Sequence, residues 1–257
     1  MPGYILPHNL TGERDRLSLM SELLDPFERG HIQRLGLRPG WRCLEVGCGN
    51  GSIARWLAER VAPTGHVVAS DLDISYLRGV AQPCFEARQL DILHGAIEEG
   101  AYDFVVARAM LHHLAGARDA LQRMVSALKP GGVLLSIEPD FLPCTIAEPA
   151  ALRSFWQGWL RWSADCGIDY FIGPKIPVWL DGLGMEQVGA EGHTPLFNGD
   201  ARWAEYWLET IRELRPRLLE SGHITEELLA EFDAHFRDPH YWTRVLTAVA
   251  TWARKLG

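Results

Sequence analysis

The chain has 257 residues, enough for one large domain or one domain with a cap, and its 47% hydrophobic content is typical of a globular protein. The formal net charge of −8 argues against a nucleic-acid partner, and no apolar run is long enough to span a bilayer. The N-terminus lacks the regions of a signal peptide, and the five scattered cysteines, without a Cys-x-x-Cys pair, predict reduced thiols and no metal site. We therefore expect a cytoplasmic protein without a membrane, nucleic-acid or metal partner.

The first 35 residues predict an irregular start and two helices. Residues 1–11 are rich in Pro and Gly, and Thr11 is a candidate cap for a helix from about 12 to 24. Asp25-Pro26 is expected to interrupt this helix, and a second short helix is expected to end at about Leu35.

Tyr4 and Arg16 belong to this segment and can fold over the glycine-rich turn that follows. An arginine there would be placed to pair with a ligand carboxylate. The alternative for each residue is a solvated helix face.

A strand, a glycine turn and a helix N-terminus follow one another after residue 40, and the remaining elements are arranged around them. Residues 41–46 read as a short buried strand, and 53–58 have helical spacing. Between them stand three alternating glycines, Gly47, Gly49 and Gly51. Such a turn exposes backbone N–H groups to a polar or anionic ligand group, and glycine permits a close approach.

The glycine spacing differs from the Gly-x-Gly-x-x-Gly pattern of dinucleotide-binding proteins. That pattern requires glycine at position 52, where this chain has serine, and the third glycine comes one residue early. An isolated turn of this kind is also common as a purely structural feature.

Three further strands follow at the spacing of βαβ units. Residues 66–70 predict the second strand, with Asp71 at its carboxyl end, where open α/β sheets bind ligands. After a helix expected over 75–80, residues 86–90 predict a weaker third strand that ends in Asp91-Ile92. Residues 102–107 predict the fourth strand, with Arg108 just beyond it.

One or two helices are expected over 111–128, then a tight turn at 129–132 and a fifth strand at 133–138. Strands that alternate with helices in this way predict a parallel sheet with right-handed crossovers.

The second half predicts helices around two more strands. Helical spacing or capping appears at 150–165, 177–183, 201–220 and 225–236, with strands expected at 185–190 and 241–252. Eight of the ten tryptophans lie in this half, at 156, 159, 162, 179, 203, 207, 242 and 252. Most are expected to form the core of a helical cap, and two or three to line an apolar acceptor site.

At this point the chain resembles a class I S-adenosylmethionine-dependent methyltransferase, most closely the menaquinone-biosynthesis-like and actinobacterial small-molecule types. The resemblance covers about residues 35–140 and rests on Leu44-Glu45-Val46-Gly47-Cys48-Gly49-Asn50-Gly51, Asp71, Asp91-Ile92, the strand 102–107 and Leu128-Lys129-Pro130-Gly131-Gly132. It implies an α/β, Rossmann-like, doubly wound sheet of seven strands, the last antiparallel, with a helical cap. The organisation implied is a lid segment at 1–35, a cofactor-binding core at 36–140, and the remaining sheet with cap helices at 141–257.

The resemblance also implies roles toward the cofactor, S-adenosyl-L-methionine. Glu45 would steady the glycine loop or meet the amino group through water, and Asp71 would hold the ribose hydroxyls. Leu72 would lie against the adenine, while Asp91 and the Ile92 backbone would bond it. The methionine end would be lined by Gly47, Cys48, Gly49, Gly51, Ala107 and Arg108, with Arg16 and Tyr4 as candidates from the lid.

Methyl transfer requires alignment, a dry pocket and, for some acceptors, a base. His112 and His113 follow the fourth strand, and histidine is suited to accept a proton near neutral pH. His113 is the first candidate base and His112 the second, although a structural role for at least one is equally consistent with the resemblance. Glu138 and Asp140, after the fifth strand, are rival bases or groups that orient the acceptor or hold loop N–H groups.

The leading functional hypothesis is methylation of O, N or C of a small, apolar or aromatic metabolite in secondary metabolism, by a monomer or homodimer. A cyclase or another non-methylating enzyme on the same fold is one alternative. A protein or RNA methyltransferase is another, although the acidic balance, the tryptophan-rich half and the absence of an Asn-Pro-Pro-Tyr-type tetrapeptide after the fourth strand count against it.

Overall fold

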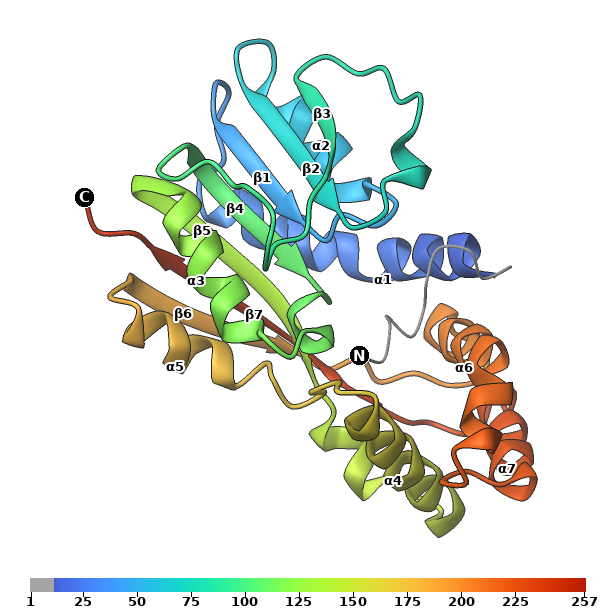
Figure 1. Cartoon of the computed structure of the whole chain (residues 1–257). Coiled ribbons are helices and arrows are strands. Elements are labelled where there is room, and N and C mark those ends of the chain that lie inside the picture. The colour runs from blue at the N-terminus through green and yellow to red at the C-terminus, as the bar shows by residue number, and fades with distance from the viewer. Residues whose placement is uncertain (1–11) are drawn as a thin grey trace.

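A computed structural model describes residues 12–257, so the predictions for Tyr4, Thr11 and the irregular start lie outside the described residues. Seven strands form one sheet in the order β3-β2-β1-β4-β5-β7-β6 (Figure 1). Strands β1 to β5 are parallel, and β7 runs antiparallel to both β5 and β6, as expected from the resemblance. The strands are β1 Arg42–Val46, β2 His66–Asp71, β3 Phe85–Gln89, β4 Tyr102–Arg108, β5 Leu128–Asp140, β6 Glu186–His193 and β7 Thr247–Arg254.

Helices cover both faces of the sheet because neighbouring strand residues point to opposite sides. On one face, α3 and α5 pack over a core that includes Leu44. On the other face, α1 and α2 pack over a core that includes Cys43. The helices are α1 Glu13–Arg34, α2 Ser52–Val61, α3 Ala117–Ala127, α4 Ala150–Asp165, α5 Lys175–Gly182, α6 Arg202–Glu220 and α7 Glu226–Phe236.

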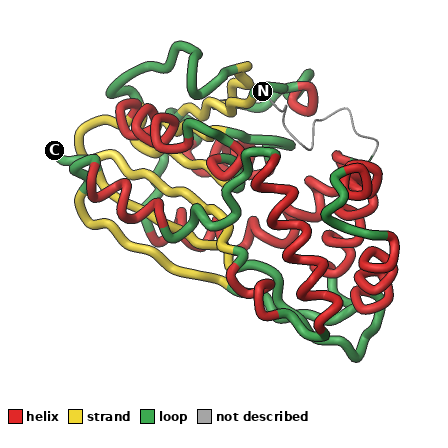
Figure 2. Tube along the Cα trace, turned by 60° about the horizontal axis from the view of Figure 1, so that its bottom comes forward, coloured by secondary structure: helices red, strands yellow, loops and turns green. Residues whose placement is uncertain are grey.

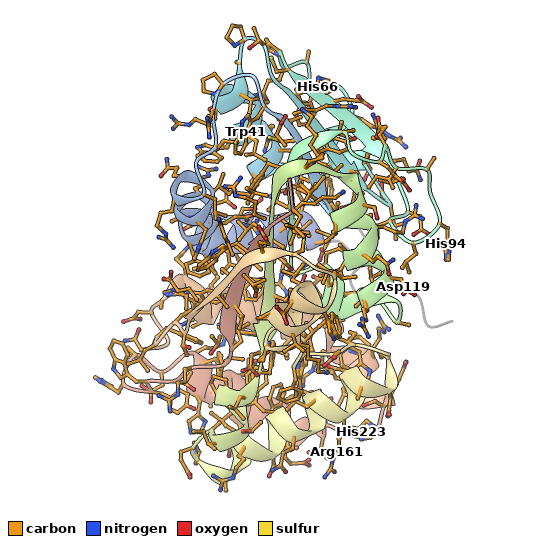
Figure 3. All side chains as sticks on the ribbon, turned by 90° about the vertical axis from the view of Figure 1, so that its left-hand side faces the viewer. Trp41, His66, His94, Asp119, Arg161 and His223 are labelled. Atoms are coloured by element: carbon orange, nitrogen blue, oxygen red, sulfur yellow. The ribbon has the colours of Figure 1, made fainter. Side chains whose placement is uncertain are left out.

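The cap is a separate aromatic core at one end of the sheet, where α4, α6 and α7 gather beyond the strands (Figure 2). Trp156 and Trp159 of α4 and Trp207 of α6 are buried in it. In Figure 3, Arg161 and His223 mark this end, and Trp41 and His66 mark the opposite end. The predicted cap on Thr225 is confirmed, since its hydroxyl accepts a hydrogen bond from the Leu228 N–H of α7.

The predicted break at Asp25-Pro26 is wrong, because α1 continues through Pro26 to Arg34. Proline costs one backbone hydrogen bond inside a helix, but Leu24, Asp25 and Glu28 around it are all buried against the sheet. Tertiary packing therefore outweighs the local preference.

Two other local predictions also need correction. The helix expected over 75–80 is only the 3₁₀ turn Ser75–Leu77, since Arg78 is extended and Gly79 has a φ of +80°. The turn expected at 129–132 lies inside β5 as an irregularity. Tyr102 pairs with Leu128 and Phe104 with Val133, so the extra residues on β5 loop out of register.

Candidate active site

The glycine loop leads from the end of β1 into α2. Gly47, Gly49 and Gly51 all have positive φ, at +72°, +51° and +72°. The Gly49 N–H donates to Oδ2 of Asp71 over 2.8 Å, and the Gly47 N–H donates to the Ser70 carbonyl over 2.8 Å. The end of β2 therefore holds the loop in place.

The protein itself, and not only a ligand, requires glycine at two of these positions. A Cβ on Gly47 would lie 2.6 Å from Cγ of Met110, and one on Gly51 would lie 2.5 Å from Cδ2 of Leu77. Both contacts are shorter than carbon atoms allow, so a side chain would displace the residues that shape the site.

A cavity of about 300 Å³, here called the glycine-loop cavity, opens at the carboxyl ends of β1, β2 and β4. Most of the predicted cofactor residues line it: Glu45, Gly47, Cys48, Gly49, Asp71, Leu72, Asp91, Ile92 and Arg108. Gly51 and Ala107 do not line it, because Gly51 begins α2 and Ala107 is buried within β4. Arg16 also lies outside its wall.

Several residues of this wall were not predicted from the sequence. From α1 come Leu17, Met20 and Ser21, and from the segment after β4 come Ala109, Met110 and Leu114. Ala109 has a φ of +51°, a backbone strain that marks the chain reversal there. Asn50 of the glycine motif bonds Ser21 of α1 through its amide nitrogen over 3.0 Å, which ties α1 to the loop.

The cavity wall divides into regions of different chemistry. Leu72, Leu90 and Ile92 form an apolar region beside Asp71 and Asp91, and Leu72 is 57% exposed. At the other end, Glu45 is buried and its Oε2 has no hydrogen-bond partner among the described residues. These regions fit a nucleoside linked to an amino acid. The apolar region suits a base, the carboxylates suit hydroxyl groups, and the buried acid without a partner suits a cation.

Arg108, predicted to flank the methionine end of the cofactor, lies in the wall of the glycine-loop cavity and binds two carboxylates of α1. Its Nη1 donates to Oδ1 of Asp25 over 2.8 Å and to Oε2 of Glu28 over 2.5 Å, so it joins β4 to α1. We call Asp25, Glu28 and Glu45, together with Arg108, the acid cluster.

A second cavity of about 90 Å³, here called the aromatic cavity, lies under the cap. It shares Met20, Arg108, Ala109 and His113 with the glycine-loop cavity, so the two are adjacent. Its remaining wall consists of Arg16, Leu24, His112, Ile137, Glu138, Pro139, Phe141, Trp159, Tyr170, Trp203, Tyr206, Trp207, Thr210, Leu246 and Ala248. Asp140, the rival base, is absent from both walls.

Arg16 is the cation that α1 contributes to the aromatic cavity. It is 3% exposed and forms a bidentate pair with Glu13, with both N–O distances 2.7 Å. Its Nη1 also donates to the hydroxyl of Tyr206 on α6 over 3.1 Å. One buried guanidinium thus connects α1 with the cap.

Glu138 holds the turn that carries both histidines. Its carboxylate accepts hydrogen bonds from the N–H groups of Met110, Leu111 and His112, and it lies 2.8 Å from Nδ1 of His112. The predicted role in holding loop N–H groups is therefore what the geometry shows. Burial raises the pKa of Glu138 to about 7, and the three backbone donors oppose that rise.

The two histidine rings lie against each other with centroids 3.9 Å apart. Burial lowers the pKa of His112 to about 3, and desolvation, His112 and Arg16 lower the pKa of His113 well below its usual value. Both rings are therefore neutral at pH 7, and burial makes each a weaker base than a free imidazole. His113 lines both cavities, whereas His112 lines only the aromatic one.

Comparison with known proteins finds a methyltransferase-domain family model that matches residues 44–134. An uncharacterized methyltransferase of Mycobacterium bovis, Mb0092, is 33% identical over 124 residues, which cover 46% of this chain and 57% of that protein. The ubiquinone/menaquinone biosynthesis C-methyltransferase UbiE of Ectopseudomonas mendocina is 34% identical over 121 residues, 44% of this chain and 47% of that one. The matched part thus spans about half the length of these relatives.

Two solved structures share the fold over most of the chain. Phosphoethanolamine N-methyltransferase 2 of Haemonchus contortus, solved with S-adenosylhomocysteine, is 18% identical with a TM-score of 0.59, covering 95% of this chain and 53% of that one. The [4+2]-cyclase SpnF is 17% identical with a TM-score of 0.59, and the match covers 91% of this chain and 81% of that one. These similarities concern the fold and leave the reaction open.

None of the helices in residues 12–257 combines the length and apolar character needed to cross a membrane. Within the same residues, no three His, Cys, Asp or Glu side chains are grouped closely enough to bind a metal ion. All five cysteines carry free thiols.

Proposed function

We propose that the chain, whose residues 44–134 match a methyltransferase-domain family model, is a class I S-adenosylmethionine-dependent methyltransferase that methylates an oxygen of a small aromatic acceptor. The observation that carries the proposal is the adjacency of the two cavities. The glycine-loop cavity suits the cofactor, and the aromatic cavity that shares four wall residues with it suits the acceptor.

When bound, S-adenosylmethionine supplies a methyl group on a positively charged sulfur. Asp71 would accept hydrogen bonds from the ribose hydroxyls while keeping its bond to the Gly49 N–H. Leu72, Leu90 and Ile92 would enclose the adenine, and Glu45 would lie beside the amino group.

The aromatic cavity limits the size and shape of the acceptor. An engineered cavity of about 150 Å³ takes up a single benzene ring, so a site of about 90 Å³ suits no more than one ring. Phe141, Trp159 and Tyr170 offer flat faces to such a ring.

The polar groups of the aromatic cavity favour an acceptor that carries an acidic oxygen. The Tyr206 hydroxyl accepts from Arg16 and keeps its own proton to donate. The indole nitrogens of Trp159 and Trp207 are buried donors without a partner among the described residues. A phenol or carboxylic acid would accept the Tyr206 proton, and the Arg16 guanidinium would stabilise its anion.

His113 is our candidate base because it is the histidine at the junction of the cavities. Glu138 and His112 act as a positioning pair, since Glu138 holds the turn through three N–H groups and fixes the His112 ring. The lowered pKa of His113 makes its neutral imidazole a weaker base than a free histidine, so we expect it to serve an acceptor with an acidic proton, such as a phenol.

The test uses methyl-labelled S-adenosylmethionine and a panel of monocyclic phenols and benzoates. We expect one methyl group on the product and an equal amount of S-adenosylhomocysteine. We expect His113→Asn to lower turnover about 10²- to 10⁴-fold without changing the affinity for S-adenosylhomocysteine. His94→Asn, which changes an exposed histidine outside both cavities, is the control.

Other outcomes would overturn parts of the proposal. A product of unchanged mass would indicate cyclase-like chemistry on this fold. Labelling only of added protein or RNA would indicate a macromolecular acceptor. Near-normal turnover of folded His113→Asn would remove the histidine base.

A further inference from the structure

Two buried carboxylates beside the glycine-loop cavity have an oxygen without a partner. Glu28 of α1 is fully buried and Glu45 of β1 is 5% exposed. Oε1 of Glu28 and Oε2 of Glu45 form no hydrogen bond with any described residue. Buried acids of this kind are unfavourable unless a cation or a proton neutralises them.

The charges of the acid cluster do not balance within the protein. Arg108 pairs with Asp25 and Glu28, and Arg29 pairs with Asp25 over 2.8 Å from a side chain that is 38% exposed. The three carboxylates of Asp25, Glu28 and Glu45 therefore face the two guanidinium groups of Arg108 and Arg29. When all five groups are ionised, one negative charge is in excess. Glu45, which lines the cavity, has no guanidinium partner of its own.

Electrostatics indicate where a proton resides when no other cation is present. Burial raises the pKa of Glu28 to about 7, with Arg108 opposing and Asp25 reinforcing the rise. Burial and the nearby Glu28 charge raise the pKa of Glu45 well above its usual value. Near neutral pH, the pair of acids therefore holds a proton that two exposed glutamates would have lost.

We propose that Glu28 and Glu45 share one proton in the free protein and release it when the α-ammonium group of S-adenosylmethionine or S-adenosylhomocysteine takes over as their counter-charge. The balance is simple: a carboxylic acid and the ligand ammonium give an ammonium–carboxylate pair and one proton in solution. Glu28 is thereby a cofactor-affinity residue supplied by the lid helix. This inference depends on the cofactor and is independent of the acceptor.

The neighbouring groups make the effect specific to this pair. The charged groups that face the two acids are Asp25 and Arg29 of α1 and Arg108 of β4, and the Ser52 hydroxyl of α2 donates to Asp25 over 3.0 Å. The remaining titratable side chains of the cavity wall are Cys48, Asp71, Asp73, Asp91 and His113. His113 is already neutral at pH 7, and burial raises the pKa of the Cys48 thiol, so neither has a proton to release on binding.

The experiment is calorimetric titration of the whole chain with S-adenosylhomocysteine in phosphate and in Bis-Tris, two buffers that both act near pH 6 and differ in ionisation enthalpy. We expect release of about one proton at pH 6 and a Kd that falls by up to tenfold per unit between about pH 5.5 and pH 7. 5′-Methylthioadenosine, which lacks the amino-acid end, is expected to bind with no proton release. Equal proton balance for the two ligands, or a Kd for S-adenosylhomocysteine that is independent of pH, would overturn the proposal.

Variants identify the residue responsible. Glu28→Gln removes one acid, so Glu45 ionises before binding. We expect proton release to disappear and the Kd for S-adenosylhomocysteine to rise about tenfold at pH 7, with the Kd of 5′-methylthioadenosine unchanged. Glu22→Gln, on the exposed side of the same helix, is the control. If Glu28→Gln does not fold, the proposal is tested by the comparison of S-adenosylhomocysteine with 5′-methylthioadenosine on the wild type. Full proton release in folded Glu28→Gln would exclude Glu28.

Discussion

Arg108 is the residue whose replacement gives the most informative test of the acid cluster. Its Nη1 lies 2.8 Å from Asp25 and 2.5 Å from Glu28, and all three side chains are at most 9% exposed. Arg108→Met keeps much of the side-chain volume and removes the charge. Asp25 keeps its contacts with Arg29 and Ser52, whereas Glu28 loses its hydrogen-bonded ion pair with Arg108.

The expected loss of stability depends on pH. Removing one partner of a buried ion pair costs about 3–5 kcal/mol, because the other charge stays buried and unpaired. Glu28 already has its pKa raised by burial to about 7, so it takes up a proton readily when Arg108 is gone. Each pH unit below the raised pKa recovers about 1.4 kcal/mol, so we expect a loss of about 4 kcal/mol at pH 8 and about 2.6 kcal/mol at pH 6, one unit below that pKa.

The measurement is the free energy of unfolding in urea, for wild type and Arg108→Met at both pH values. A carboxyl whose pKa is raised in the folded state binds more protons folded than unfolded, so the wild type also loses stability as pH rises from about 4.5 toward 7. The comparison is therefore made between the two proteins at each pH. Arg202→Met, which removes an exposed ion pair between α6 and Glu22 of α1, is the control and should leave the urea midpoint unchanged. A loss of stability below about 1 kcal/mol at pH 8, or the same loss at both pH values, would contradict the role of Arg108 as the charge partner of Glu28.

Three further changes test the loop, the cofactor site and the cap. Gly47→Ala places a Cβ 2.6 Å from Met110 at a φ of +72°, so we expect thermal stability to fall and binding of S-adenosylhomocysteine to be lost; unchanged binding would contradict the close packing. Asp71→Asn keeps an acceptor for the Gly49 N–H but removes the charge, so we expect calorimetry to show about 10- to 100-fold weaker binding of S-adenosylhomocysteine, and equal affinity would remove Asp71 from the site. Trp156→Ala empties the centre of the cap and should cost about 3–5 kcal/mol in urea unfolding, whereas a cost near zero would mean that the cap core is not closely packed.

The central sheet was predictable because its signals are local. Buried strands such as Arg42–Val46 and Tyr102–Arg108 are short apolar runs bounded by turn residues, and the glycine loop has its own spacing. The continuous α1 was not predictable, because the rule for Pro26 is local whereas the contacts that outweigh it come from distant strands. The helix predicted over 75–80 forms only the 3₁₀ turn Ser75–Leu77 for a related reason, since Leu77 alone of these three residues is buried and packing does not extend the turn.

The candidate site divides in the same way. Residues within the glycine motif and at strand ends, such as Asp71 and Asp91, were predicted from their position, and the structure brings them to one cavity. Arg16 was predicted to approach the cofactor but lines the aromatic cavity instead, paired with Glu13 and bonded to Tyr206. Helical spacing places Arg16 on α1 but carries no information about which cavity that face of the helix meets.

The order of strands and helices, the glycine loop and the acids at the strand ends follow from local sequence patterns, because these features depend on spacing within a few residues. Folding of distant segments onto one another brings Glu28 of α1 to Arg108 of β4 beside Glu45, and Arg16 to Tyr206 under the cap. Whether such residues act as ligands, counter-ions or bases depends on their burial and on the charges around them. Those properties arise from contacts between segments far apart in the chain, which no local pattern encodes.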